Sequence, residues 1–341
     1  MITLKEIAER CGCSVATVSK SLNEMPDISA LTAQRVRDAA SEMGYQPNAA
    51  ARTLKTNRSR TIGLMFFLDG RSVWSHEYFG MIAASIQSEM EESGYDLTPI
   101  NCDGVGMRAS QLNYCRYRGY DGLIVMSVGS TGESFMELID SEIPLVTIDY
   151  EFHHRGAVIS DNVQGMRDLL TYIHGRGHRR IAFIHGEDTS VTRNRLASYY
   201  TFCDEAGLCV PDAYVKPAIY RQTQRAQAAT RELLALAQPP TCILYPDDYA
   251  AVGGLNEFRR QHITVPAQIS IAGYDGIELA RDLNPMLTTI QQDTTGIGRH
   301  AARMLLKAIE KPRNFIPRHM VLPGKLLEGG TVKDLTVPDA G

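Results

Sequence analysis

The chain has 341 residues, of which 44% are hydrophobic and 22% are charged, and its formal net charge is −4. This composition is typical of a folded globular protein and excludes a largely disordered chain. Single hydrophobic cores stop growing at roughly 250 to 300 residues, so the length predicts a small domain together with a larger body. No apolar run reaches membrane-spanning length and the N-terminus does not resemble a signal peptide, so we expect a cytoplasmic protein.

The seven cysteines are odd in number and scattered along the chain, which fits neither a zinc site nor a small disulfide framework. Cys11 and Cys13 are the one close pair. Small buried residues on either side of the turn residue Gly12 explain this pair better than a metal or redox motif does. We therefore expect reduced thiols, no metal site and no cofactor.

The first sixty residues carry nine Lys and Arg against six Asp and Glu, so this part is basic although the whole chain is acidic. Thr3 and Glu6 form the pattern of a capping box, which predicts the start of a helix. Gly12 then stops that helix, and Ser14 is placed to cap a second one over residues 15–22. Two short helices joined by a glycine turn predict a helix-turn-helix.

A third helix, capped by Ser29 or Thr32 and ended by Gly44, would complete a three-helix domain over residues 1–46. The outward side of the second helix carries Thr17, Ser19 and Lys20. Short hydroxyls and a long base suit contacts with phosphates and base edges of DNA. The alternative is a small helical bundle with no role in DNA binding.

Residues 47–60 form the predicted hinge and linker. A proline breaks the chain, and Asn48 is placed to cap a short Ala-rich helix. Leu54 lies between Arg52 and Lys55, an arrangement that suits an apolar wedge in a minor groove with flanking phosphate contacts. The alternatives are a solvated linker and packing of Leu54 between domains. The bases of this stretch are Arg52, Lys55, Arg58 and Arg60.

From Thr61 onward, apolar β-rich segments alternate with amphipathic helices. This alternation predicts an α/β body with parallel sheets covered by helices on both faces. The segments are too many for one sheet, so we expect two doubly wound lobes, with the chain crossing near residues 158–162. The predicted lobes of this 61–341 body are 61–158 with 292–320, and 159–291 with 321–330. The predicted strands are 62–67, 121–126, 144–148, 181–185, 242–245 and 269–272.

Ligands of such folds bind at the carboxyl ends of the strands, so the residues that follow each strand are candidates for a binding site. Carboxylate and guanidinium groups recognise neighbouring hydroxyls, and aromatic rings can cover the apolar face of a sugar. For any single aspartate, the alternative is a helix N-cap after a strand. The polar candidates are Asp69, Ser127, Asp149, Asp161, Arg195, Asp247 and Asp275, and the aromatic candidates are Trp74, Tyr78, Phe79 and Tyr220.

Two segments, TLKEIAERCGCSVATVSKSLN and YQPNAAARTLKTNRSRTIGL, resemble the DNA-binding headpiece and hinge of the lactose-repressor/galactose-repressor (LacI) family. The body resembles the periplasmic-binding-protein-like core of the same family. The resemblance implies a homodimer whose second helices read the major grooves of two half-sites, while paired hinge helices insert Leu54 at the centre of a near-palindrome. It also implies control by a small-molecule effector.

The resemblance assigns roles by position. The base-reading positions match Val15, Ala16 and Lys20, and the backbone-contacting positions match Thr17, Ser19 and Asn23. Further DNA-binding candidates are Thr3, Ser14, Asn48, Ala51, Arg52, Leu54 and Lys55. The effector-contacting positions match Asp149, Arg195, Asp247 and Asp275, together with Tyr78, Phe79 and Tyr220. The chain departs from the family at Ala30-Leu31, where two acidic residues are common, at Asp247, where asparagine is common, and over residues 69–77, which are longer than usual.

We therefore expect a sequence-specific DNA-binding transcription regulator, a repressor controlled by a sugar. An enzyme is the first rival, but the sequence lacks a dinucleotide fingerprint, a P-loop, a nucleophile elbow and an HExxH metal motif. A secreted solute-binding protein is the second rival, and the headpiece argues against it. A regulator of the same family that responds to a nucleobase or to a protein partner is the third, and only the pocket separates it from a sugar sensor.

Overall fold

The computed structural model describes residues 2–22, 25, 27–46, 53, 58–66, 76–102, 110–126 and 132–337. The chain divides into two compact units, Met1–Ser59 and Arg60–Gly341, and each is described by itself. None of the helices among these residues combines the length and the hydropathy that crossing a membrane requires.

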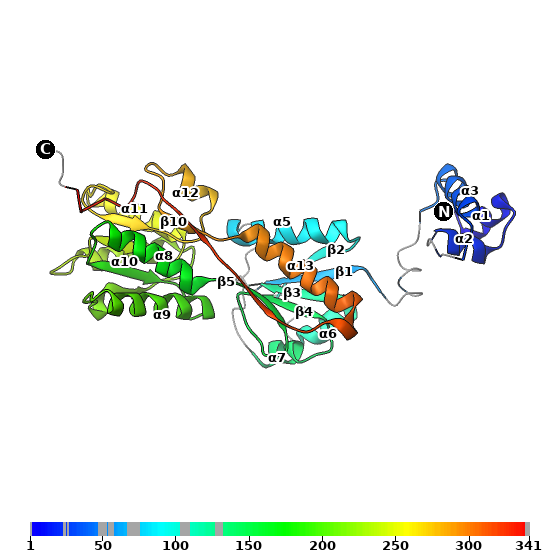
Figure 1. Ribbon diagram of the computed structural model, residues 1–341, viewed down its shortest axis with the longest axis horizontal. Helices are drawn as coiled ribbons and strands as arrows, with labels where there is room; N and C mark the ends of the chain where they lie inside the picture. The colour runs from blue at the N-terminus through cyan, green and yellow to red at the C-terminus, as the bar shows by residue number, and fades with distance from the viewer. Residues whose placement is uncertain are drawn as a thin grey trace. The chain divides into compact units, whose positions relative to one another are not determined.

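The smaller unit contains α1 (Leu4–Cys11), α2 (Val15–Leu22) and α3 (Ala30–Glu42) (Figure 1). The predicted capping box begins α1. The N–H of Thr3 donates to Glu6 Oε2 over 2.7 Å, and the N–H of Glu6 donates to Thr3 Oγ1 over 3.4 Å. Gly12 ends the helix with a φ of 61°, a conformation that glycine adopts without a steric penalty. The first helix therefore begins and ends where its sequence predicts.

The other two helices of this unit are also capped by hydroxyls. Ser14 Oγ accepts from the N–H of Thr17 over 3.0 Å, and Ser29 Oγ accepts from the N–H of Thr32 over 3.2 Å. Small side chains let the three helices approach closely, and larger apolar side chains fill the centre. This core consists of Ile7, Ala8, Cys11, Val18, Val36, Ala39 and Ala40. The thiol of Cys11 is thus part of the helical packing.

The larger unit begins with a lobe built on a six-stranded parallel sheet in the order β11-β5-β4-β3-β1-β2, here called the first lobe. α5 and α13 pack on one face of this sheet, and α6 and α7 pack on the other (Figure 1). The strands are β1 (Thr61–Phe66), β2 (Asp96–Asn101), β3 (Gly122–Met126), β4 (Leu145–Ile148), β5 (Gly156–Ser160) and β11 (His319–Leu322). The helices are α5 (Glu77–Glu92), α6 (Gln111–Arg118), α7 (Glu133–Ile139) and α13 (Thr294–Glu310).

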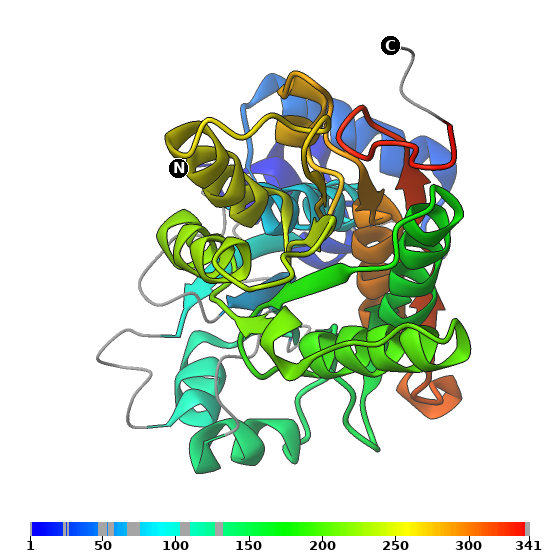
Figure 2. The same cartoon turned by 90° about the vertical axis from the view of Figure 1, so that its left-hand side faces the viewer.

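The second lobe has a four-stranded parallel sheet in the order β7-β6-β8-β9. α8 and α9 cover one face and α10 and α11 cover the other, so both sheets show the predicted α/β layering (Figure 2). The strands are β6 (Ile181–His185), β7 (Val215–Pro217), β8 (Cys242–Leu244) and β9 (Ser270–Ala272). The helices are α8 (Asn162–Gly175), α9 (Ser190–Glu205), α10 (Thr223–Leu234), α11 (Asp248–Arg260) and the short α12 (Glu278–Asp282).

The chain passes between the lobes where β5 leads into α8, where β10 (Thr289–Gln291) leads into α13, and where β11 leads into β12 (Lys325–Leu327). β10 and β12 pair antiparallel, so two of these connecting segments also hydrogen-bond to each other. The sequence did not predict β2, β5, β7, β10, β11 or β12 as strands. β2 and β7 contain prolines and lie at sheet edges, where the apolar pattern of a buried strand is not required.

Candidate functional site

One face of α2 is exposed and carries a lysine between small side chains. Val15 is 44% exposed, and Ala16 and Lys20 are exposed as well, whereas Val18 is buried in the core. Ala16 and Lys20 are four residues apart and therefore share a face of the helix. Small apolar side chains can contact thymine methyl groups, and a lysine can reach guanine or a phosphate. This face has the chemistry of a DNA-reading surface.

Lys20 forms an exposed ion pair with Asp27, and the hydrogen bond from its ammonium group lowers the pKa of the Asp27 carboxyl. Water screens such a pair, so it contributes little to stability. Lys20 can therefore exchange this carboxylate for a base or a phosphate.

The remaining DNA-binding candidates of the smaller unit divide into two groups. Thr3 and Ser14 are exposed at the starts of α1 and α2, where backbone N–H groups can also bind phosphate. The hydroxyl of Thr17 lies 2.9 Å from that of Ser14, and Ser19 is half-buried. Asn23, Asn48, Ala51, Arg52, Leu54 and Lys55 lie outside the described residues.

Arg60, the last base of the predicted linker, is the first residue of the larger unit and packs within it. Its Nη1 donates to the carbonyl of Ser93 over 3.3 Å, and its guanidinium carbon lies 5.3 Å from the centre of the Tyr95 ring. These contacts tie the start of β1 to the end of α5. The guanidinium of Arg60 is thus part of the packing of the larger unit.

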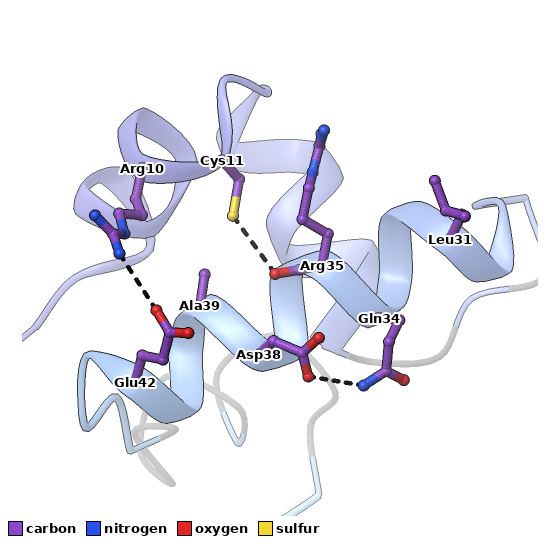
Figure 3. Close-up of a pocket in the computed structure, with 8 residues that line it drawn as sticks. All are labelled: Arg10, Cys11, Leu31, Gln34, Arg35, Asp38, Ala39 and Glu42. Atoms are coloured by element: carbon purple, nitrogen blue, oxygen red, sulfur yellow. Dashed lines mark hydrogen bonds and ion pairs between the residues drawn. The ribbon is translucent and has the colours of Figure 1, made fainter.

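A shallow groove lies between α1 and α3 (Figure 3). An ion pair of 3.3 Å between Arg10 and Glu42 closes one end, and the 82% exposed side chain of Leu31 lies at the other. Gln34 Nε2 donates to Asp38 Oδ1 over 2.8 Å along its floor. Two bases and two acids line the groove, and α2 contributes none of the lining residues. This groove is therefore distinct from the exposed face of α2.

In the larger unit, polar side chains from both lobes meet where the chain crosses between them. Tyr78 in the first turn of α5 and Asp149 after β4 come from the first lobe. Arg195 on α9 and Asp275 after β9 come from the second lobe, and Gln292 lies between β10 and α13. Four of these five side chains were predicted from the sequence as effector contacts.

Arg195 is the buried cation of this region, with 3% of its surface exposed. Its Nε donates to Asn162 Oδ1 over 2.7 Å, and its Nη1 donates to the carbonyl of Pro246 over 2.8 Å. Its Nη2 lies 4.0 Å from Asp275 Oδ1, which is an ion pair but not a hydrogen bond. The guanidinium carbon lies 3.5 Å from the centre of the Tyr274 ring, so the group also stacks on that ring. These contacts fix the orientation of the guanidinium.

Gln292 links the two lobes through its side-chain amide. Its Nε2 donates to Asp275 Oδ1 over 2.7 Å, and its Oε1 accepts from the hydroxyl of Tyr78 over 3.2 Å. That hydroxyl is also 3.4 Å from Asp149 Oδ2, and Asp149 Oδ1 accepts from the N–H of Ser160 over 3.1 Å. The two aspartates are thus joined through one tyrosine and one glutamine.

Asn162 completes a closed circuit of polar groups. Its Oδ1 accepts from Arg195, and its Nδ2 donates to the carbonyl of Ser160 over 3.0 Å. The inter-lobe circuit, as we call it, consists of Asp149, Ser160, Asn162, Arg195, Asp275, Gln292 and Tyr78. Because its members come from both lobes, a change in the angle between the lobes must rearrange it.

The backbone is strained at both aspartates of the circuit. Asp149 has a φ of 62° and Asp275 a φ of 106°, values that residues with a side chain rarely adopt. The N–H of Asp149 donates to the carbonyl of Val158 over 3.0 Å, and that of Asp275 to the carbonyl of Ile290 over 2.9 Å. Such strain costs about 1 to 3 kcal/mol per residue and persists mainly at binding and catalytic sites.

Tyr220 is held as an aromatic platform at the end of β6. A Cβ added to Gly186 would lie 2.1 Å from Cε2 of the Tyr220 ring, so the ring lies directly against the glycine backbone. The tyrosine hydroxyl is 2.8 Å from Thr192 Oγ1, and the tyrosine N–H donates to Glu187 Oε2 over 2.8 Å. Glycine at position 186 is therefore required for this placement.

The other predicted effector contacts have different surroundings. The ring of Phe79 makes tilted contacts with the rings of His76 and Tyr78, and it packs on the core of the first lobe. Asp161 accepts from a backbone N–H in the first turn of α8 over 2.9 Å, and Asp247 accepts from one in the first turn of α11 over 2.7 Å. The helix-cap role thus applies to both aspartates. Asp69, Trp74 and Ser127 lie outside the described residues.

The sequence did not single out three buried residues of this region, Asn162, Asp248 and Gln292. Asn162 and Gln292 flank the points where the chain changes lobes, and a search for polar side chains at the predicted crossing over 158–162 would have found the first. Asp248 begins α11. Its Oδ1 accepts from the hydroxyl of Thr289 over 2.7 Å, and its Oδ2 accepts from the N–H of Ile277 over 3.0 Å. Burial raises the pKa of Asp248 to about 8.

We expect the free energy of unfolding to fall as the pH rises from about 4 to about 8. Over this range the unfolded chain has released the proton of Asp248 while the folded protein still holds it. Because the folded state binds the extra proton, each rise in pH lowers the free energy of unfolding. Urea unfolding at pH 5 and pH 8, followed by circular dichroism, measures the difference. Asp248→Asn should reduce the difference in the free energy of unfolding between pH 5 and pH 8, whereas the control Asp204→Asn, at an exposed site, should not. Equal pH dependence in both variants would contradict a raised pKa of Asp248.

Two family models match the sequence. Residues 3–48 match the family described as bacterial regulatory proteins, lacI family, and residues 170–332 match the periplasmic binding protein-like domain. The first match covers the three helices of the smaller unit, and the second covers most of the second lobe.

Curated relatives extend the match over nearly the whole chain. The HTH-type transcriptional repressor PurR of Vibrio campbellii (strain ATCC BAA-1116) is 30% identical over 343 residues, which is 98% of this chain and 100% of the relative. The ribose operon repressor of Escherichia coli (strain K12) is 30% identical over 318 residues, which is 92% of this chain and 94% of the relative. Both are transcriptional repressors by name.

A solved structure gives the same fold. The lac repressor dimer bound to operator and the anti-inducer ONPF has a TM-score of 0.82 and 24% sequence identity, over 97% of this chain and 99% of that one. The headpiece sequence, the two-lobed core and the full-length relatives agree. The chain therefore belongs to the lacI family of bacterial regulatory proteins, which are DNA-binding transcriptional repressors.

Proposed function

We propose that the protein is a homodimeric repressor of a near-palindromic operator, and that a sugar bound beside the inter-lobe circuit controls it. In this proposal α2 of each copy reads one half-site, and the hinge over residues 47–60 inserts Leu54 at the centre. Its target is chromosomal DNA, so its place is the cytoplasm.

One observation supports the sugar assignment most directly. The buried Arg195 and two aspartates, Asp149 and Asp275, belong to one hydrogen-bonded circuit with residues from both lobes. Carboxylates only accept hydrogen bonds and a guanidinium only donates them, whereas a sugar hydroxyl does both. Neighbouring hydroxyls therefore match Arg195 together with Asp149 or Asp275. The ring of Tyr220 offers an apolar surface for the C–H face of the sugar. The relative named as a ribose operon repressor supports the same chemistry.

The proposed control works through the angle between the lobes. A ligand that replaces contacts of the inter-lobe circuit binds one lobe arrangement better than the other, and only this difference in affinity can shift the equilibrium. A coupling of about 1 to 3 kcal/mol is typical of allosteric proteins. Release of the operator by the ligand is the expected sign.

A thermal-shift screen of the full-length protein tests the sugar assignment. The probes are monosaccharides, disaccharides and nucleobases, because ligand that binds the folded state raises the melting temperature. We expect one of the sugars to raise the melting temperature. The same sugar should release DNA that the protein has selected from a random-sequence pool. A shift produced only by a nucleobase would leave the proposal of a DNA-binding repressor in place and would contradict the sugar effector.

Lys20→Ala should change base preference rather than weaken all DNA binding alike. We expect a loss of about 1 to 3 kcal/mol at particular operator positions and little change at others, because this lysine lies on the exposed face of α2. Binding of single-base operator variants, measured by fluorescence anisotropy, gives the position-by-position cost.

Arg10→Ala is the matched control for Lys20. Arg10 is also an exposed base of the headpiece, but it pairs with Glu42 in the groove between α1 and α3. Its removal should leave base preference unchanged. If both variants give the same profile across operator positions, α2 is not the reading helix.

A further inference from the structure

Acidic side chains outnumber basic ones around the inter-lobe circuit, within the part of the chain that the structure describes. Each of four buried or nearly buried carboxyl groups interacts electrostatically with Arg195 or with another of the four, and Arg221 is the second cation near them. The four are Asp149, Asp247, Asp248 and Asp275. Two guanidinium groups therefore lie in a region that holds four carboxyl groups.

All four carboxyl groups lie where a negative charge is costly. Burial raises the pKa of each of them; for Asp275 burial is the largest cause, Arg195 opposes it, and Asp247 and Asp248 add to it. The site therefore already holds as much negative charge as its cations can balance. A further negative charge brought by a ligand would be buried without a counter-ion, which is costly.

Two buried donors of the circuit nevertheless have hydrogen-bonding capacity to offer a ligand. The hydroxyl of Ser160 is buried, and it interacts with the hydroxyl of Tyr78, whose raised pKa it partly offsets. Nη2 of Arg195, on a side chain only 3% exposed, lies 4.0 Å from Asp275, beyond hydrogen-bonding distance. These donors lie among carboxylate acceptors. A ligand hydroxyl can accept from the donors and donate to the carboxylates, so it satisfies both.

We infer that the effector carries no negative charge: the site takes an uncharged sugar and discriminates against sugar phosphates and sugar acids. This inference rests on the proposed function and adds the charge class of the effector to it. The discrimination comes from a repulsive element, the excess of aspartates, as well as from the attractive contacts of Arg195.

Isothermal titration calorimetry on the full-length protein tests the inference with matched ligands. The probes are ribose, glucose and galactose, the terminal phosphate ester of each, and the uronate and uronamide of the two hexoses. A uronamide has nearly the shape of the uronate without its charge. We expect the uncharged sugar that binds, and its uronamide if it is a hexose, to bind at least about tenfold more tightly than the charged derivatives.

Asp275→Asn provides the matching change in the protein. Asparagine keeps the size of the side chain and an oxygen that can accept from Gln292, and it tolerates a positive φ. The variant should narrow the difference in affinity between the uncharged and the charged ligand at least about threefold, because one of the carboxyl groups that compete with a charged ligand for Arg195 is removed. Asp204→Asn removes a charge from the exposed surface of α9 and should leave this difference unchanged.

The outcomes separate the inference from the proposed function. A phosphate or uronate that binds more tightly than its uncharged counterpart overturns the inference and leaves a sugar site in place. The inference is also overturned, in favour of steric exclusion, if Asp275→Asn leaves the difference in affinity between uncharged and charged ligands unchanged, or if the uronamide binds as weakly as the uronate. If no sugar of any charge binds, the proposed function fails and the inference fails with it.

Discussion

The Arg195→Ala variant should bind the effector at least about 100-fold more weakly than the wild-type protein, a loss of about 2.7 kcal/mol. The substitution removes the guanidinium donors of the inter-lobe circuit and leaves Asp275 without its cation. It should also lower the free energy of unfolding by about 3 kcal/mol, because one partner of a buried pair is left unpaired. Calorimetry measures the first effect and urea unfolding the second. Operator affinity without effector should persist, because the headpiece is a separate unit.

Arg193→Ala is the matched control for Arg195. Arg193 lies on the same helix and pairs with Asp188, but its side chain is 62% exposed. Its removal should change neither effector affinity nor stability appreciably. Arg195→Lys keeps the charge without the planar fork and should fold even if Arg195→Ala does not. Wild-type effector affinity in Arg195→Lys would show that the directed hydrogen bonds of the guanidinium are not needed.

Gly186→Ala should weaken effector binding about 10- to 100-fold while the protein remains folded. The added methyl group would occupy the space of the Tyr220 ring, whose atoms lie 2.1 to 2.5 Å from the new Cβ, so the ring must leave its position. The platform for the apolar face of the ligand is then lost. Calorimetry measures the affinity, and near-ultraviolet circular dichroism reports the displaced tyrosine.

Gly175→Ala is the control for this substitution. Gly175 ends α8 in the same lobe, and a Cβ added there meets no atom within 4 Å among the described residues. We expect unchanged effector affinity and stability at least equal to that of the wild-type protein. If Gly186→Ala also binds the effector normally, Tyr220 does not form part of the binding surface.

The sequence predicted best what local interactions determine. The capping box of Thr3 and Glu6 and the turn at Gly12 involve residues only a few positions apart, so their pattern is visible without the fold. Long apolar runs such as β3 and β6 were found because buried parallel strands are apolar on both faces. β10 and β12 have three residues each and depend on each other, so their signal is tertiary.

Some residues of the candidate site could likewise be predicted from local sequence alone. A position after a strand suffices to nominate Asp149 or Asp275, but it does not distinguish a ligand contact from a helix cap, as Asp161 and Asp247 show. That distinction depends on what the other lobe brings into contact. Gln292 is a polar residue like many others in the sequence and acquires its role only because β10 and α5 come together.

The return of the chain through β11 and β12 bears on how the protein is made. The edge strand of the first sheet and the partner of β10 both lie after residue 318, so neither lobe can be completed until these strands have been synthesised. The headpiece precedes both lobes in the chain, and its core contains only its own residues. A nascent chain can therefore carry a folded DNA-binding domain well before it has a sensor, and truncation before residue 319 should leave a headpiece without a stable body.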